Sequence, residues 1–307
     1  MRDGDGVLPG TAPAPAVPRP LEDLEVRSDD GTRLHVEVHG DPAASSVVLV
    51  HGWTCSIGLW VRQLRDLAGE FRLIAYDQRG HGRSGEPQAA GYTTDALADD
   101  LAAVLRSTVR PGERAVVVGH SMGGIAVVAL AGRQPQVIRE QVAAVLLAST
   151  GVDELVIRGR ILPLPLPLAR AVRPVTSLLI SGRAQRRRDT ALTRRALRYA
   201  ALSRTASADD LELCLALATT CPPGTRQGFA ATLVRLDLAA TLPHLVVPTV
   251  VLVGTADRLT PMWHARRLAE ALPRCLRLVE LPGVGHMTPV QAPAVVEDVI
   301  RDLAGTS

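Results

Sequence analysis

A serine at position 121 lies between two glycines, where a predicted strand gives way to a predicted helix. Ser121 follows the apolar run 115–118, and the run 125–131 after it has a helical pattern. The string G-x-S-x-G at such a turn is the nucleophile elbow, in which a strained backbone lifts the serine hydroxyl above the sheet. Gly119 and Gly123 lack the side chains that would block a close approach of strand and helix. The pattern predicts a serine nucleophile near the free N–H groups of a helix start.

Strand and helix patterns alternate along most of the chain, which predicts an α/β fold with a mostly parallel central sheet flanked by helices. Alternating residues on both sides of the Asp-Gly turn at 29–32 predict an antiparallel hairpin at the start. Short apolar runs follow, as a sheet covered on both faces requires. These later strands are predicted at 47–50, 72–76, 115–118, 142–148, 250–254 and 276–281.

The alternation stops at Gly151 and resumes at Val250. The residues up to about Asp237 show helical patterns without convincing strands, which predicts a helical cap inserted after the sixth strand. Ser207 and Asp210 have the spacing of a capping box. Helices are predicted at about 57–68, 94–107, 207–219, 226–235 and 290–303, with one more helix that starts at Pro261 and has Thr260 as its N-cap.

The chain therefore divides into four predicted segments. Residues 1–20 contain five prolines and no apolar run, so we expect a mobile tail and no secretory signal. The core domain takes residues 21–150 and 239–307. The cap takes residues 151–238, including a run at 161–168 whose spaced prolines favour an extended chain packed on the core or lining the substrate pocket.

The amino-acid composition argues against several classes of function and of site. The 307 residues carry a formal charge of +3, which is too mild to indicate nucleic acid. All basic residues other than histidine are arginine, so a lysine nucleophile or Schiff base is excluded. Prolines together with Arg170 and Arg173 argue against a transmembrane helix in the cap. The four cysteines, Cys55, Cys214, Cys221 and Cys275, lack metal-ligand spacing, so we expect free thiols, no metal and a cytoplasmic location.

Two further patterns have an ordinary and a functional interpretation. The glycines between Gly80 and Gly85 spell G-x-G-x-x-G after a strand, but no helix opens there to bind a pyrophosphate, so we interpret the loop as a structural turn. The run 183–198 holds seven arginines. It is either a solvated helix face or a docking surface for an anionic partner such as an acidic carrier protein. These arginines are Arg183, Arg186, Arg187, Arg188, Arg194, Arg195 and Arg198.

Several motifs together resemble the α/β-hydrolase superfamily, in particular its capped, esterase-like serine hydrolases. They are His51-Gly52-Trp53, the loop 77–84, the turn 119–124, the segment 254–257 and Gly285-His286, in the order that the family has. The resemblance runs from about Leu24 to Leu303 and is poor in the cap. It implies that the fold is an α/β-hydrolase fold.

The resemblance also implies a catalytic triad in the chain order serine, aspartate, histidine. Ser121 needs a base to take its proton, and without one the motif would be an ordinary glycine-rich turn. His286, in a glycine-flanked loop after the last predicted strand, is the candidate base, because imidazole titrates in the right range. Asp257 is the candidate acid that holds one tautomer of the imidazole, and Asp153 is the alternative. His120 is expected to support the elbow.

The same resemblance assigns the oxyanion hole to the backbone N–H groups of Trp53 and Met122. It implies no metal and no organic cofactor. The expected reaction is hydrolysis of a carboxylic ester or lactone of a small to medium apolar substrate through an acyl-enzyme on Ser121. Epoxide hydrolases and haloalkane dehalogenases are disfavoured, because they place an aspartate at the nucleophile position. A tryptophan directly after His-Gly, as Trp53 is here, also occurs in esterases with a perhydrolase side activity.

Two alternatives remain open at this stage. The first is a thioesterase or biosynthetic tailoring hydrolase that acts on an acyl group bound to a carrier protein. The second is a ligand-binding relative in which the pocket survives and turnover does not. The sequence does not name the acyl group, the leaving group or the oligomeric state.

Overall fold

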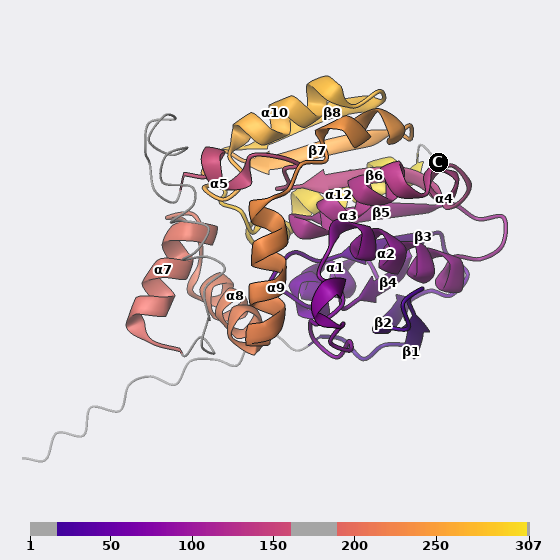
Figure 1. Cartoon of the computed structure of the whole chain (residues 1–307), viewed down its shortest axis with the longest axis horizontal. Helices are drawn as coiled ribbons and strands as arrows, with labels where there is room; N and C mark the ends of the chain where they lie inside the picture. Colours follow the sequence, from indigo (N-terminus) through magenta and orange to yellow (C-terminus); the bar gives the residue numbers. More distant parts are fainter. Residues whose placement is uncertain (1–16, 161–188, 306–307) are drawn as a thin grey trace, which may run out of the picture.

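The computed structural model describes residues 17–160 and 189–305 (Figure 1). The strands of this part are β1 (Glu22–Arg27), β2 (Arg33–Gly40), β3 (Ser46–Val50), β4 (Arg72–Tyr76), β5 (Ala115–His120), β6 (Val142–Ala148), β7 (Thr249–Gly254) and β8 (Cys275–Leu281). They form one sheet in the order β1-β2-β4-β3-β5-β6-β7-β8. The pairs β1·β2 and β2·β4 are antiparallel, and the other neighbouring pairs are parallel. The predicted fold class and opening hairpin are confirmed.

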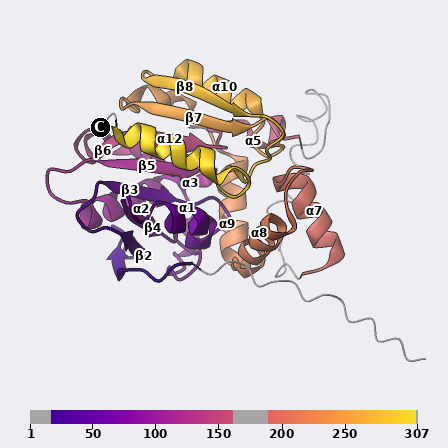
Figure 2. The same ribbon diagram turned by 180° about the vertical axis from the view of Figure 1, so that it is seen from behind.

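Helices cover both faces of the sheet, as the apolar residues of its central strands require. One core cluster includes buried residues of α2 (Thr94–Thr108), α3 (Met122–Arg133) and α10 (Met262–Ala271). A second cluster includes buried residues of α1 (Val61–Asp66) and α12 (Pro293–Gly305). Figures 1 and 2 show the two groups of helices on opposite sides of the sheet. The strand ends near the candidate site therefore belong to a sheet that is packed on both faces.

The cap, residues 151–238, is mostly helical in its described part. Its helices are α5 (Leu155–Arg158), α7 (Ala191–Ala201), α8 (Ala208–Thr220) and α9 (Pro223–Val234). Helices α7, α8 and α9 lie beside one end of the sheet (Figure 1). An isolated antiparallel bridge between Asp153 and Asp237 joins the start of the cap to its end. The predicted capping box of Ser207 and Asp210 is confirmed at the start of α8.

Some predicted features differ from the structure, and others lie outside the described residues. The predicted C-terminal helix at 290–303 is two helices, α11 (Thr288–Gln291) and α12, because Pro293 begins a new helix and lacks the N–H that a continuous helix would use. The short helix α4 (Pro135–Gln141) was not expected. Most of the predicted tail and the run 161–168 lie outside the described residues. No helix in the described ranges is both long and apolar enough to cross a bilayer.

Candidate active site

Ser121 lies at the sharp turn between β5 and α3. Its φ of 51° and ψ of −115° place a non-glycine residue outside the usual backbone regions. The turn is held in this conformation by its neighbours: the Ser121 N–H donates to the Ala148 carbonyl at 2.9 Å, and the Ser121 carbonyl accepts from the Thr150 hydroxyl at 2.7 Å. Backbone strain of this kind persists only where surrounding structure enforces it, and it is concentrated at functional sites.

Glycines allow the elbow to fit against the neighbouring strand. A Cβ atom at Gly123 would lie 2.1 Å from the Val50 carbonyl oxygen, and one at Gly119 would lie 2.7 Å from backbone atoms of Gly124. A Cβ atom at Gly52 would lie 3.1 Å from Cβ of Ser121. The loop after β3 therefore packs directly on the elbow, which explains why glycine is needed on both sides of the contact.

The proposed oxyanion donors lie on these two segments. Met122 is the first residue of α3, and Trp53 follows Gly52. Within the described residues, neither backbone N–H donates a hydrogen bond to another protein group. Two unused donors beside a serine, one of them at a helix start, are what a developing oxyanion requires.

His51 orients the Trp53 loop. Its Nε2 accepts from the Gln78 N–H at 2.9 Å, so its Nδ1 carries the proton and donates to the Gly52 carbonyl at 2.7 Å. Burial lowers the pKa of His51, which keeps the ring neutral and preserves this tautomer. The Gln78 side-chain amide donates to the His51 carbonyl as well. The ring and the carbonyl of His51 are thus both bonded to Gln78, which follows β4.

His286 and Asp257 meet behind the elbow. Nδ1 of His286 lies 2.9 Å from Oδ2 of Asp257, and both side chains are buried. The carboxylate also accepts from the Thr260 hydroxyl at 2.8 Å and from the backbone N–H groups of Leu259 and Thr260 at 2.8 and 2.9 Å. These donors fix the carboxylate so that one oxygen faces the imidazole, as the acid of a triad requires.

Thr260 is a residue that the sequence did not assign to the site. It was expected to cap the helix from Pro261, but α10 begins at Met262, Pro261 is its N-cap, and the Thr260 hydroxyl binds Asp257. That hydroxyl also lies 2.9 Å from the Ser149 carbonyl oxygen, so two acceptors share its single proton, and it lies 3.2 Å from Nδ1 of His286. The spacing Asp-x-x-Thr is the signal that could have indicated this turn.

His120 connects the base to the elbow. Nε2 of His120 donates to the His286 carbonyl at 3.0 Å, and the two rings lie 5.1 Å apart between centroids. Burial and the neighbouring His286 lower the pKa of His120 to about 3, so the ring is neutral. Because His120 precedes Ser121, this contact brings the His286 loop to the serine turn. No hydrogen bond joins Ser121 Oγ to the His286 ring among the residues that are described.

The alternative acid, Asp153, has a different neighbour. Its carboxylate forms an ion pair with Arg267 at 3.0 Å, and burial raises its pKa. The carboxylate that contacts the imidazole of His286 is therefore that of Asp257. The Gly80–Gly85 loop closes on itself through a hydrogen bond of 2.9 Å from the Gly80 N–H to the Gly85 carbonyl, as a structural turn does.

The cysteines and the arginine run are partly described. All four cysteines are free, and burial raises the pKa of Cys55 to about 12 and that of Cys221 to about 11, which keeps these thiols protonated. Arg194 forms ion pairs with both Asp189 and Glu212. Arg195 and Arg198 belong to α7. The remaining arginines of the run, Arg183, Arg186, Arg187 and Arg188, lie outside the described residues.

Comparisons with known proteins find matches over most of the chain. A family model described as "Alpha/beta hydrolase family" matches residues 47–299. A Yersinia enterocolitica protein named as a carbamate hydrolase, RutD, is 32% identical over 245 residues, which are 78% of this chain and 81% of that protein. A Mycobacterium bovis protein named as an oxidoreductase, EphD, is 42% identical over 103 residues, but the match spans 33% of this chain and 17% of that protein.

Solved structures extend the likeness over nearly the whole chain. A thermophilic esterase from Thermogutta terrifontis is 27% identical with a TM-score of 0.70, and the match covers 92% of this chain and 97% of that one. The esterase RhEst1 from Rhodococcus sp. ECU1013 is 25% identical with a TM-score of 0.73, and the match covers 92% of this chain and 98% of that one.

Proposed function

The chain belongs to the alpha/beta hydrolase family, and from this premise we propose that it is a serine hydrolase of carboxylic esters or lactones. Its neighbours in structure include esterases, which supports ester hydrolysis in general. The observation that carries the proposal is the contact of 2.9 Å between His286 and Asp257, in a loop bound through His120 to the turn of Ser121. We propose small to medium apolar substrates.

In the proposed reaction, Ser121 Oγ attacks the ester carbonyl while Nε2 of His286 takes its proton. The carbonyl oxygen becomes an oxyanion that accepts hydrogen bonds from the N–H groups of Trp53 and Met122. The C–O bond to the alcohol then breaks, and the alcohol leaves with the proton from His286. Water attacks the acyl carbon while His286 takes a proton from it, the bond between that carbon and Ser121 Oγ breaks, and His286 returns the proton to Oγ as the acid leaves. Asp257 stays ionised and stabilises the imidazolium.

The experiment is covalent labelling combined with turnover. The purified chain is treated with a fluorophosphonate probe, and its hydrolysis of p-nitrophenyl esters of increasing acyl length is measured. We expect one probe adduct on Ser121 and hydrolysis of the shorter esters. The Ser121→Ala variant should lose both, while Ser45→Ala, a change in an exposed loop, should keep both.

Three results would contradict the proposal. They are no hydrolysis of any ester, labelling that persists in the Ser121→Ala variant, and tight ligand binding without an acyl-enzyme by mass spectrometry. The last result would favour the ligand-binding alternative.

A second candidate is a thioesterase that acts on acyl groups attached to an acidic carrier protein. It draws on Arg195 and Arg198, which form no ion pair with a carboxylate among the described residues. If this candidate holds, kcat/KM should be higher for a carrier-bound thioester than for the matched free thioester, and salt should reduce the difference. Equal values at low and high salt would exclude it.

A further inference from the structure

The loop of the proposed base, residues 285–287, lies against the end of the cap helix α7. The His286 N–H donates to the carbonyl of Ala201, the last residue of α7, at 2.9 Å. A Cβ atom at Gly285 would lie 2.7 Å from the carbonyl carbon of Leu202, so the two backbones are in direct contact. The position of the base loop is therefore linked to the cap.

The side chain of Gln291 connects the same two segments. Its Oε1 accepts from the Gly285 N–H at 3.1 Å, and its Nε2 donates to Ser203 Oγ at 2.8 Å. Gln291 is the last residue of α11, and this helix is bonded to the core, because Gln63 on α1 donates to the Pro289 carbonyl at 3.1 Å. The amide thus extends from a fixed helix and uses one polar atom on the base loop and the other on the cap.

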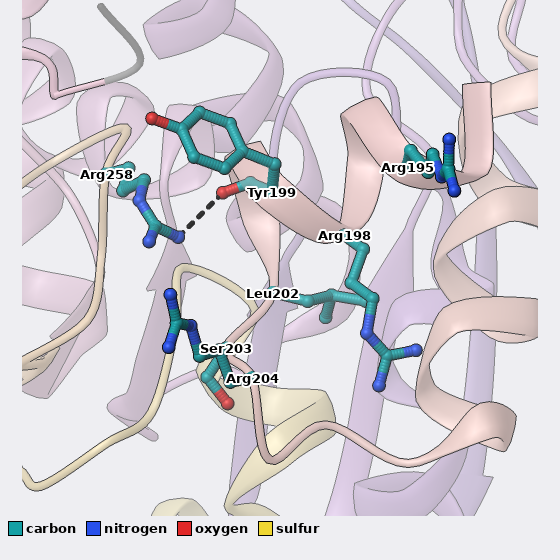
Figure 3. Close-up of a pocket in the computed structure, with 7 residues that line it drawn as sticks. All are labelled: Arg195, Arg198, Tyr199, Leu202, Ser203, Arg204 and Arg258. Atoms are coloured by element: carbon teal, nitrogen blue, oxygen red, sulfur yellow. Dashed lines mark hydrogen bonds between the residues drawn. The ribbon is translucent and has the colours of Figure 1, made fainter. Parts of the chain in front are cut away.

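The loop of the proposed acid contacts the same end of α7. Arg258, which follows Asp257, donates to the Tyr199 carbonyl at 2.8 Å, and its guanidinium lies 4.5 Å from the centroid of the Tyr199 ring. Figure 3 shows this hydrogen bond, with Ser203 on the chain just after α7. The segment 199–203 therefore contacts the loops of both proposed triad residues.

The two loops differ in what else holds them. The carboxylate of Asp257 is fixed by donors of its own turn, the N–H groups of Leu259 and Thr260. The backbone of His286 instead bonds to other segments: its N–H to the cap, and its carbonyl to Nε2 of His120 at 3.0 Å. A general base must lie within hydrogen-bond reach of the proton that it takes. The base therefore depends on the cap for its position more than the acid does.

We propose that Gln291 is a positioning residue that holds the loop of His286 against the cap, so that the base stays within reach of Ser121. The inference rests on the proposed function for the identity of the base. Without the amide, the Gly285 N–H and Ser203 Oγ lose the partner that joins them. A displacement of a catalytic group by about 1 Å can cost about 100-fold in rate.

The first test is steady-state hydrolysis of a p-nitrophenyl ester by the Gln291→Met variant, whose side chain has a similar length and makes neither hydrogen bond. We expect kcat to fall by about 10- to 100-fold with KM within about threefold, because the base is displaced while the oxyanion donors stay in place. Gln291→Glu should recover most of kcat, since a carboxylate accepts both from the Gly285 N–H and from the Ser203 hydroxyl.

Two control variants separate positioning from a general loosening of the protein. Gln136→Met makes the same change at an exposed position on α4. Thr225→Val removes a different hydrogen bond between cap and core, the one of 2.9 Å from the Thr225 hydroxyl to the Gly80 carbonyl. Both variants should keep kcat within about threefold of wild type. Circular dichroism and the melting temperature show whether each variant is folded.

The second test is amide hydrogen exchange, resolved by residue, which needs no turnover. The N–H groups of His286 and Met287 bond to the Ala201 carbonyl and not to Gln291. Their exchange should nevertheless be about tenfold faster or more in Gln291→Met, because the loop leaves the cap, and unchanged in Thr225→Val. If Gln291→Met does not fold, Ser203→Ala replaces it as the smaller change and should lower kcat by about 3- to 10-fold.

Four results would overturn the proposal. They are wild-type kcat in the folded Gln291→Met variant (or, if that variant does not fold, in Ser203→Ala), an equal loss of kcat in Thr225→Val, no recovery in Gln291→Glu, and unchanged exchange at His286 and Met287. A wild-type chain that hydrolyses no ester would instead contradict the hydrolase proposal, and the exchange measurement alone would then decide whether Gln291 holds the loop.

Discussion

Two buried histidine–aspartate pairs lie in the described part of the chain, and only one of them is proposed to do chemistry. His286, after β8, contacts Asp257, after β7. His35, on β2, contacts Asp77, after β4. In both pairs Nδ1 of the imidazole lies 2.9 Å from a carboxylate oxygen. The distance and the burial are the same, so neither feature distinguishes the two pairs.

The surroundings of the second ring nitrogen do distinguish them. Nε2 of His35 lies 3.2 Å from a carboxylate oxygen of Asp23 and 3.5 Å from one of Glu37. A ring between carboxylates has no nucleophile to deprotonate. His286 instead belongs to a loop that is bound to His120, the residue before Ser121. The comparison shows that a histidine–aspartate contact indicates a base only when a nucleophile lies near the free nitrogen.

The largest contrast is expected for the two histidines. His286→Gln should lower kcat by at least about 10⁴-fold, because the serine loses its base. His35→Gln should keep kcat within about threefold and lower the free energy of unfolding by about 1 to 3 kcal/mol through a weakened buried hydrogen bond. Ester hydrolysis and urea unfolding measure both quantities. Equal loss of kcat in the two variants would remove the distinction.

The aspartates should show the same division. Asp257→Asn should lower kcat by about 10³- to 10⁴-fold, since an amide favours the wrong tautomer of His286. Asp77→Asn should mainly lower stability, by about 3 kcal/mol. Burial alone would raise the pKa of Asp77, but hydrogen bonds from His35 and from backbone N–H groups outweigh it, and the pKa is lowered. If Asp77→Asn lost kcat as severely as Asp257→Asn at unchanged stability, the comparison would fail.

Acid should weaken the fold through histidines outside both pairs. Burial, the main cause, lowers the pKa of His81 and His120 to about 3 and that of His264 to about 4, from an ordinary value of 6.5. The unfolded chain binds these protons first, so the stabilisation is complete above pH 6.5 and is lost as the pH falls toward 3 to 4. Each histidine contributes up to about 1.4 kcal/mol per pH unit.

Urea unfolding between pH 7 and pH 4.5 measures this slope. His264→Gln, which removes a group outside the two pairs, should reduce the slope relative to wild type. A free energy of unfolding that does not change over this range would contradict the assignment of neutral buried histidines.

The smallest effect is expected at the alternative acid. Asp153→Asn should change kcat by less than about threefold, because the carboxylate of Asp153 binds Arg267 and not His286. Its ion pair is with a half-exposed arginine, so the loss of stability should stay near about 1 kcal/mol. The same ester assay and unfolding measurement apply. A loss of kcat comparable to that of Asp257→Asn would return the role of the acid to Asp153.

The sequence predicted the sheet well and the contacts of the site less completely. Strands such as Arg72–Tyr76 and Val142–Ala148 have the expected bounds, because short apolar runs between turns have few other places to pack. Thr260 was assigned to a helix cap because local spacing favours that role. The contact of its hydroxyl with the Ser149 carbonyl instead depends on the ends of β6 and β7, which meet only in the folded chain. The contacts of Arg258 with Tyr199 on α7 depend in the same way on segments that are far apart in the sequence.

One hydrogen bond limits how the cap can be exchanged. The N–H of His286 donates to the Ala201 carbonyl at 2.9 Å, so the loop of the proposed base rests on the last residue of α7. The bridge between Asp153 and Asp237 offers convenient splice points for grafting another lid onto this scaffold. A chimaera made there inherits a working core only if the foreign lid supplies an equivalent carbonyl under the loop of residue 286.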